Sequence, residues 1–342
     1  MTVGNRKEER GERKASLAPG SSGEQRQRSE LPEAIAIVGP TASGKTSLSI
    51  EVARRLDGEV ISMDSRQVYR GMDIGTAKAT AAQRAAVPHH GLDLVDPDHR
   101  FSAGQFARAA RRWIEEVRGR GRVPLLVGGT GFFLRALTDP IFREPAHDPQ
   151  QRAAVERLLT GMPTEELHRW LAALDPPRAE RLSGWGGRQR LIRALELPLL
   201  TGRPLSWWHA NAPPEEAPLR PLVFVLDLPR ERLDTAIDAR VTEMVEQGLI
   251  REVESLLHAG YSATDPGMNA TGYIELLPYL RGEVPLEEAL EQVRRHTRAY
   301  ARRQLTWLRN QLPEGAVWLD ASRPAAELAE EIAIAWRGEN IA

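Results

Sequence analysis

Residues Gly39 to Thr46 have the clearest chemical meaning in this chain, because they read Gly-x-x-x-x-Gly-Lys-Thr. An apolar run of strand length, Ala34 to Val38, precedes them, and Ser47 to Leu56 has the composition of a helix. A strand, a glycine-bounded loop and a helix in this order form a P-loop, whose backbone N–H groups and helix dipole attract phosphate oxygens. The lysine adds a positive charge, and the threonine hydroxyl is a ligand for Mg²⁺. The candidates for diphosphate contact are therefore Gly39, Pro40, Thr41, Ala42, Ser43, Gly44, Lys45 and Thr46.

A carboxylate follows the next predicted strand, Glu59 to Met63, at position Asp64. The carboxyl end of a parallel strand, one βα unit after the P-loop, faces the same crevice as a bound phosphate. Asp64 is therefore a candidate general base or metal neighbour. An aspartate at such a junction is also a common helix N-cap, and the spacing alone does not choose between these roles.

A third predicted strand, Val123 to Val127, ends in Gly128-Gly129-Thr130. In P-loop ATPases and GTPases, a core strand ends in the aspartate that helps hold Mg²⁺. The glycines argue against hydrolysis of a nucleoside triphosphate and favour a loop that holds a phosphorylated donor. Thr130 is placed to face the same crevice.

Strands and helices alternate up to Leu137, and Leu222 to Asp227 reads as a return strand. This order predicts an α/β fold with a P-loop parallel-sheet core, made of residues 33–139 and 216–342. Residues 140–215 contain ten prolines between short amphipathic segments, which predicts a helical insertion. From Glu231 onward the chain is predicted to be mainly helical. One long helix is expected to carry Arg240 and to extend to Leu249, with Gly248 near its end.

Composition narrows the class of protein. The 342 residues carry a net charge of −1, so a nucleic-acid site must be a local patch. There are no cysteines, which excludes disulfides, thiolate catalysis and cysteine-based zinc sites. No apolar run approaches the roughly 20 residues of a membrane span. Neither such a span nor the apolar core of a signal peptide is found, so a cytoplasmic enzyme without membrane contact is expected.

Three local features have competing interpretations. Residues 1–32 mix both charge signs with few large apolar groups, so we expect a disordered tail rather than a basic RNA-binding arm. His89 and His90 are expected at a strand edge or turn rather than in a metal site. Three tryptophans of the insertion, Trp185, Trp207 and Trp208, are expected to pack its core rather than meet RNA bases.

The segment Val293 to Arg309 carries six arginines and no acid. On a helix, Arg295, Arg298, Arg302 and Arg309 fall in one stripe. A solvated charged face normally mixes both signs, so this stripe favours contact with nucleic acid or diphosphate over a plain exposed helix.

Taken together, several runs resemble the tRNA dimethylallyltransferases, in order, between about Ile35 and Asp320. The runs are Gly39 to Thr46, Ile61 to Ser65 with Tyr69, Gly71 to Lys78, Pro124 to Thr130, Gln189 to Arg193, Gly272 with Tyr273, and Arg302 to Arg309. Asn269 and Ile274 stand where many members of that family carry basic residues.

The resemblance implies a reaction. A dimethylallyl group moves from dimethylallyl diphosphate to the exocyclic amine of the adenosine 3′-adjacent to the anticodon, in tRNAs that read codons beginning with U. Lys45, Thr46 and the loop amides would hold the diphosphate with Mg²⁺ and stabilise it as it leaves. Arg240 resembles the family arginine on the donor, Asp64 the general base, and Thr41 a donor near the reaction centre.

The resemblance also implies the partners: dimethylallyl diphosphate and the tRNA anticodon stem-loop, which the helical insertion would clamp. A monomer is expected. The implied tRNA contacts are Asp64, Ser65, Arg66, Gln67, Thr130, Arg152, Gln189, Arg190, Leu191, Ile192, Arg193, Asn269, Gly272, Tyr273, Arg298, Arg302, Arg303 and Gln304.

Two other classes of protein remain as alternatives. A P-loop kinase for a small molecule or nucleoside would also lack a hydrolytic base, but it would need neither the insertion nor the arginine-rich helix. A non-catalytic P-loop protein that binds RNA would bind tRNA without forming a product.

Overall fold

The computed structural model describes residues 32–139, 142–143, 145–183 and 187–341. The predicted tail, residues 1–32, therefore lies outside the described part except for its last residue, and so does Trp185. Among the described residues, no helix is both long and apolar enough to cross a membrane.

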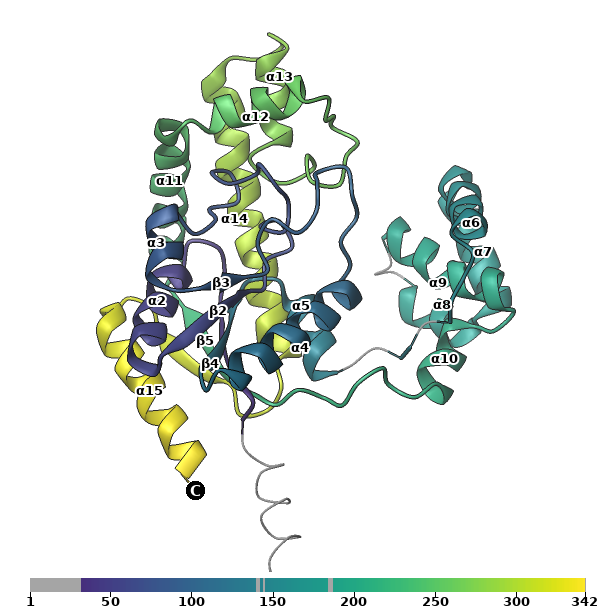
Figure 1. Ribbon diagram of the computed structural model, residues 1–342. Helices are drawn as coiled ribbons and strands as arrows, with labels where there is room; N and C mark the ends of the chain where they lie inside the picture. Colours follow the sequence, from purple (N-terminus) through teal and green to yellow (C-terminus); the bar gives the residue numbers. More distant parts are fainter. Residues whose placement is uncertain (1–31, 140–141, 144, 184–186, 342) are drawn as a thin grey trace, which may run out of the picture.

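A six-stranded sheet forms the centre of the molecule, with all neighbouring strands parallel (Figure 1). Across the sheet the strands are ordered β3 (His89–His90), β2 (Gly58–Ser62), β4 (Val123–Gly128), β1 (Ala34–Val38), β5 (Pro221–Asp227) and β6 (Val317–Asp320). All five residues of β1 are buried, as expected for a central strand covered on both faces. The parallel α/β core predicted from the alternating pattern is confirmed.

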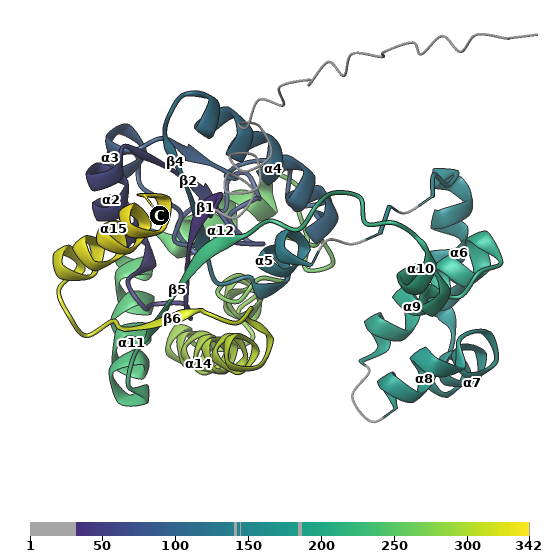
Figure 2. The same cartoon turned by 90° about the horizontal axis from the view of Figure 1, so that it is seen from below.

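Helices cover both faces of this sheet (Figure 2). On one face, α2 (Lys45–Leu56) and α15 (Ala325–Ile341) pack together over Ile35 and Ile37. On the other face, α4 (Ala103–Gly119) and α5 (Gly131–Thr138) belong to the core that includes Ala34, Ala36 and Val38. The alternating side chains of one strand therefore enter two separate cores.

The helices between β5 and β6 form the upper part of the molecule in Figure 1. They are α11 (Arg230–Gln247), α12 (Leu249–His258), the short η1 (Ile274–Leu276) and α13 (Leu277–Leu280), and the long α14 (Leu286–Gln311). Gly248 ends α11 with φ 105°, so Leu249 is the first residue of α12. The expectation that Leu249 shares a helix with Arg240 is therefore wrong. The left-handed turn that glycine permits separates two helices here.

The insertion is a small helical bundle that stands beside the sheet (Figure 1). It consists of α6 (Pro149–Gly161), α7 (Thr164–Leu174), α8 (Pro176–Leu182), α9 (Arg188–Thr201) and α10 (Leu205–Asn211). Its core is separate from those of the sheet, and Trp208 packs against it as predicted. Trp207 lies edge-on to Trp208 with ring centroids 5.1 Å apart and has Arg203 over its ring.

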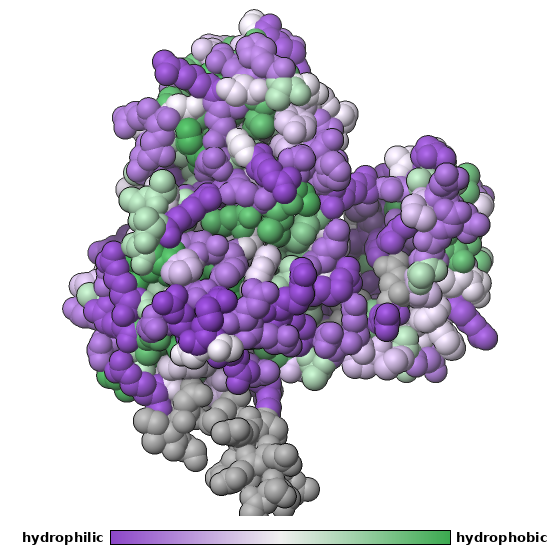
Figure 3. All heavy atoms as spheres, in the orientation of Figure 1, coloured by the Kyte–Doolittle hydropathy of each residue, from purple (hydrophilic) through white to green (hydrophobic). Residues whose placement is uncertain are grey.

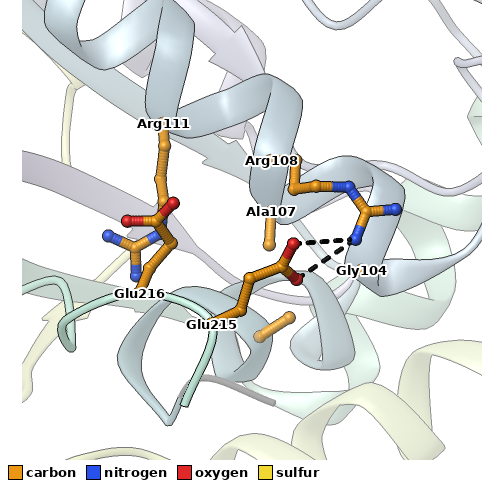
Figure 4. Close-up of a pocket in the computed structure, with 7 residues that line it drawn as sticks. Gly104, Ala107, Arg108, Arg111, Glu215 and Glu216 are labelled. Atoms are coloured by element: carbon orange, nitrogen blue, oxygen red, sulfur yellow. Dashed lines mark hydrogen bonds and ion pairs between the residues drawn. The ribbon is translucent and has the colours of Figure 1, made fainter. Parts of the chain in front are cut away.

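The chain leaves for the insertion after α5 and returns before β5, and side chains of α4 contact both places; Figure 4 shows those at the returning segment. Arg111 of α4 donates from Nη2 to the carbonyl of Leu137 at 3.1 Å and to that of Ala217 at 2.6 Å. Arg108 pairs with Glu215 at 3.2 Å, and these side chains line a small pocket away from the P-loop. One helix therefore ties the outgoing and returning connections together.

Candidate active site

A cleft of about 1160 Å³ lies between the P-loop and the C-terminal helices. Its walls come from the P-loop, the turn after β2, the loop before α3 (Ala81–Ala86), α11, residues 269–272 and α14. On the face seen in Figure 3, apolar atoms gather in a recess near the middle of the core, and most of the surface around it is polar. Sequence candidates that line the cleft are Thr41 to Thr46, Asp64, Arg66, Gln67, Arg240, Asn269, Gly272, Arg303 and Gln304.

The P-loop has the backbone that its glycines predict. Gly44 adopts φ 85°, and a Cβ on Gly39 would lie 3.0 Å from the carbonyl oxygen of Leu226. No side chain caps the start of α2, so its first N–H groups remain available to an anion. Two N–H groups of the predicted cradle are already used, because Thr41 donates to Oε1 of Gln304 at 2.8 Å and Ser43 donates to the carbonyl of Pro40 at 3.4 Å.

Among the cations that line the cleft, Lys45 and Arg240 have lowered pKa values. Burial, with the like charge of Arg240, lowers the pKa of Lys45 from 10.5 to about 7, while the charge of Asp64 opposes this change. Burial also lowers the pKa of Arg240. The Arg240 side chain has neither an ion pair nor a hydrogen bond within the described chain. Lys45 is half-buried and donates from Nζ to the carbonyl of Pro40 at 2.5 Å, and Arg240 is also half-buried. Two half-buried cations without an ion pair among the described residues suit a multivalent anion.

Asp64 lies in a turn and does not cap a helix. Its Oδ1 accepts the N–H of Arg66 at 2.8 Å, and the residues that follow form turns, so the N-cap alternative is wrong. Burial, and after it the charge of Asp64, raises the pKa of Tyr300 to about 12. Nearby, Thr130 Oγ1 accepts the N–H of Ser65 at 3.0 Å. The segments that follow β2 and β4, which the sequence predicts to face one crevice, are therefore in contact.

The glycines after β4 permit close approach of α14. A Cβ on Gly129 would lie 2.1 Å from Nε2 of Gln304, and one on Gly131 would lie 2.1 Å from the ring of Trp307. The position where ATPases carry an aspartate is thus closed by a helix that runs across the strand end. A side chain as large as aspartate would therefore clash with α14 at these two positions.

The cleft offers oxygen atoms that could coordinate a metal cation. Thr46 and Asp64 both border the cleft, and a hydroxyl and a carboxylate fit Mg²⁺ that is also held by phosphate oxygens. Within the described ranges, no group of three His, Asp or Glu residues could hold a metal by itself. His89 and His90 form the edge strand β3, as predicted, and His90 bonds Glu59 at 2.7 Å.

Several candidates for RNA contact have structural roles in addition. Gln304 is 7% exposed, and Tyr273 is fully buried.

Leu191 and Ile192 are buried in the core of the insertion, whereas Gln189, Arg190 and Arg193 of the same run are exposed. Arg152 and Arg193 both pair with the buried Glu196. Asn269 accepts a hydrogen bond from Nη1 of Arg66 at 2.9 Å, which joins the 269–272 loop to the turn after Asp64.

The arginine stripe of α14 is less uniform than the sequence indicates. Arg298 pairs with Asp238 of α11 and with Glu291, at 3.7 Å from the latter. Arg294 pairs with Glu287 at 2.8 Å. Arg295, Arg302 and Arg303 are exposed and have no acidic partner among the residues described. Arg309 pairs with Asp227 of β5 at 3.9 Å. The one-sign surface therefore reduces to Arg295, Arg302 and Arg303, because α11, the first turns of α14 and β5 supply acids to the others.

Tyr300 lines the same cleft as Asp64, although no sequence motif predicts a role for it. Its position on α14, three and four residues before Arg303 and Gln304, places all three on the wall of the cleft. That spacing was the only available signal, and it did not show that Asp64 lies opposite.

A parallel P-loop core, with Lys45, Arg240 and the Asp64 carboxylate around one cleft, is typical of a P-loop group-transfer enzyme. Comparisons with known proteins specify which one. The family described as IPP transferase matches residues 67–311, and the one described as Isopentenyl transferase matches residues 32–89. The chain belongs to the tRNA dimethylallyltransferase family.

Individual relatives cover most of the chain. A tRNA dimethylallyltransferase of Geobacter metallireducens is 44% identical over 280 residues, which are 82% of this chain and 90% of the relative. The structure of a tRNA isopentenylpyrophosphate transferase from Bacillus halodurans has a TM-score of 0.64 and 39% identity, covering 90% of this chain and 97% of that one. A eukaryotic dimethylallyltransferase described as acting on tRNA has a TM-score of 0.76 and 28% identity, covering 90% and 79%. These relatives support the transferase and not the kinase alternative.

Proposed function

We propose that this enzyme transfers a dimethylallyl group from dimethylallyl diphosphate to the exocyclic amine of the adenosine 3′-adjacent to the anticodon, in tRNAs that read codons beginning with U. The observation that carries the proposal is one cleft in which Lys45 and Arg240 face Asp64. The cations suit a diphosphate that gains negative charge as it leaves, and the carboxylate suits an amine that loses a proton.

On the donor side, the start of α2, Lys45 and Arg240 bind the diphosphate. Thr46, with the phosphate oxygens, would hold Mg²⁺, which supplies further positive charge to the leaving group. Thr41 borders the reaction centre, and apolar residues of α11 that line the cleft, including Ile237, suit a short hydrocarbon.

On the acceptor side, Asp64 takes the proton from the amine. A bond forms between the amine nitrogen and the first carbon of the dimethylallyl group, the bond from that carbon to oxygen breaks, and diphosphate leaves with the electron pair. The adenine must leave the stack of the anticodon loop to enter the cleft. Arg66, Asn269 and the 268–273 loop lie on this side.

We further propose that the anticodon stem-loop lies between the core and the insertion. The exposed Arg295, Arg302 and Arg303 of α14 and the exposed Gln189 and Arg190 of α9 suit phosphate and base contacts. Because its substrate is tRNA, we assign the enzyme to the cytoplasm, and we expect it to act as a monomer.

The test is mass spectrometry of the anticodon-loop nucleosides after incubation of the protein with Mg²⁺, dimethylallyl diphosphate and unmodified tRNA. The expected product is isopentenyladenosine at the position after the anticodon. Asp64→Asn should lose product formation but still bind tRNA, because it removes the base and little positive surface. Phosphoryl transfer from ATP to a nucleoside, with no prenylated tRNA, would overturn the proposal.

A further inference from the structure

Glu252 of α12 accepts four hydrogen bonds, three from the loop at residues 73–75 and one from Tyr273. Its Oε2 accepts the N–H groups of Asp73 and Ile74, both at 2.8 Å. Its Oε1 accepts the N–H of Gly75 at 3.0 Å and the hydroxyl of Tyr273 at 2.5 Å. Three successive N–H groups that converge in this way form an anion-binding nest, and here the anion is a side chain 177 to 179 residues away.

The fourth donor, Tyr273, fixes the same loop by packing. Its side chain is fully buried, and a Cβ on Gly75 would lie 2.5 Å from its ring, so the close contact requires glycine. Burial and the Glu252 carboxylate raise the pKa of the Tyr273 hydroxyl, which therefore remains a donor. The far end of the loop is held by Lys78, whose Nζ donates to Asp73 at 2.8 Å and to Asp93 at 2.6 Å.

This loop borders the cleft and fixes a residue beside Asp64. Residues 73–78 line the cleft, and the carbonyls of Thr76 and Ala77 each accept a hydrogen bond of 3.1 Å from Nε2 of Gln67. Oε1 of Gln67 accepts the hydroxyl of Ser62 at 2.8 Å. Both ends of the Gln67 amide are thus engaged, which fixes the turn that carries Asp64.

We propose that Glu252 is a positioning residue for the acceptor half of the reaction, which rests on the function proposed above. It holds the 73–78 loop, the loop holds Gln67, and Gln67 holds the turn that presents Asp64 to the incoming adenosine. The donor half has different supports, because Gln304 joins the P-loop to the residue after β4. Loss of the Glu252 carboxylate should therefore impair use of tRNA and leave donor binding nearly unchanged.

The test compares Glu252→Gln with Glu254→Gln, a matched change at an exposed residue of the same helix that takes no part in the loop network. The glutamine keeps one acceptor oxygen and cannot serve four donors. We expect kcat/KM for tRNA to fall at least tenfold, with the dissociation constant of dimethylallyl diphosphate within twofold of wild type. Tyr273→Phe, which removes one donor, should give a smaller loss of the same kind.

Hydrogen exchange of the amides of residues 73–75 provides a readout that does not depend on turnover. Protection should fall in Glu252→Gln and stay unchanged in Glu254→Gln. Normal kcat/KM for tRNA together with lost protection would overturn the positioning role, and so would equal losses in donor binding and tRNA use. Absence of product from the wild-type enzyme would instead overturn the proposed function, while the exchange data would still test the anchoring of the loop.

Discussion

Replacing Gln304 by leucine tests whether this side chain supports the P-loop or mainly contacts RNA. Gln304 is 7% exposed and joins two segments that are distant in sequence. Its Oε1 accepts the N–H of Thr41 at 2.8 Å, and its Nε2 donates to the carbonyl of Gly129 at 3.0 Å. Leucine keeps a similar volume and removes both hydrogen bonds.

The magnitude follows from the two backbone groups that lose a partner. A buried polar group left without a hydrogen bond costs about 1–3 kcal/mol. Thr41 borders the cleft, where water can replace its partner, whereas Gln304 Nε2 and Gly129 meet in the interior. We therefore expect a loss of about 2–4 kcal/mol in the free energy of unfolding, which lowers Tm by about 3–6 °C for a chain of this size.

The assay combines thermal unfolding with steady-state kinetics. Because the P-loop loses a support, KM for dimethylallyl diphosphate should rise together with the fall in Tm. Gln311→Leu is the control, since Gln311 is exposed at the end of the same helix and bonds only Arg135 within the described residues. An unchanged Tm and donor KM, with a raised KM for tRNA alone, would refute this reasoning and assign Gln304 to RNA contact.

The remaining predictions concern charged side chains. Above pH 7 the lowered pKa of Lys45 means that diphosphate binding must take up a proton, so calorimetry should show weaker binding as pH rises to 9, and Lys45→Arg should lose this dependence. Glu59 is buried beside Arg120, and its pKa is lowered from 4.5 to about 2. It should stabilise the fold by up to about 3 kcal/mol above pH 4.5, and this contribution disappears as pH falls toward 2; chemical unfolding of Glu59→Gln at pH 7 and pH 3 would reveal it. Arg302→Ala should lower the slope of log K for tRNA against log salt by about 0.7–0.9, and the paired Arg298 should give a smaller change; equal slopes for both variants would contradict this.

The sequence was sufficient where the relevant forces are local. The P-loop, its flanking strand and helix, and the glycine turn at Gly44 depend on neighbouring residues and on backbone sterics, and each was located correctly. The order of strands and helices likewise predicted a parallel sheet, because a short strand buried on both faces needs an apolar run.

Other features required the folded chain. The sequence indicates a helix end near Gly248 but does not show that Leu249 begins a new helix. A glycine near a helix end permits a left-handed turn and leaves the direction of the next residues open. The partner of Arg298 was missed because Asp238 lies 60 residues earlier and on another helix. The role of Glu252 has no signal in its own neighbourhood, since all four donors come from segments 21 or more residues away.

The sequence alone determined which phosphate-binding device the chain carries and which carboxylate follows the next strand. The tertiary structure decided which charges remain available in the cleft and which are neutralised, and it placed Asp64, Tyr300 and Arg240 around one space. The physical reason is that a backbone turn depends on a few adjacent dihedral angles. The pairing and burial of a side chain depend on atoms that only long-range packing brings within a few ångströms of it.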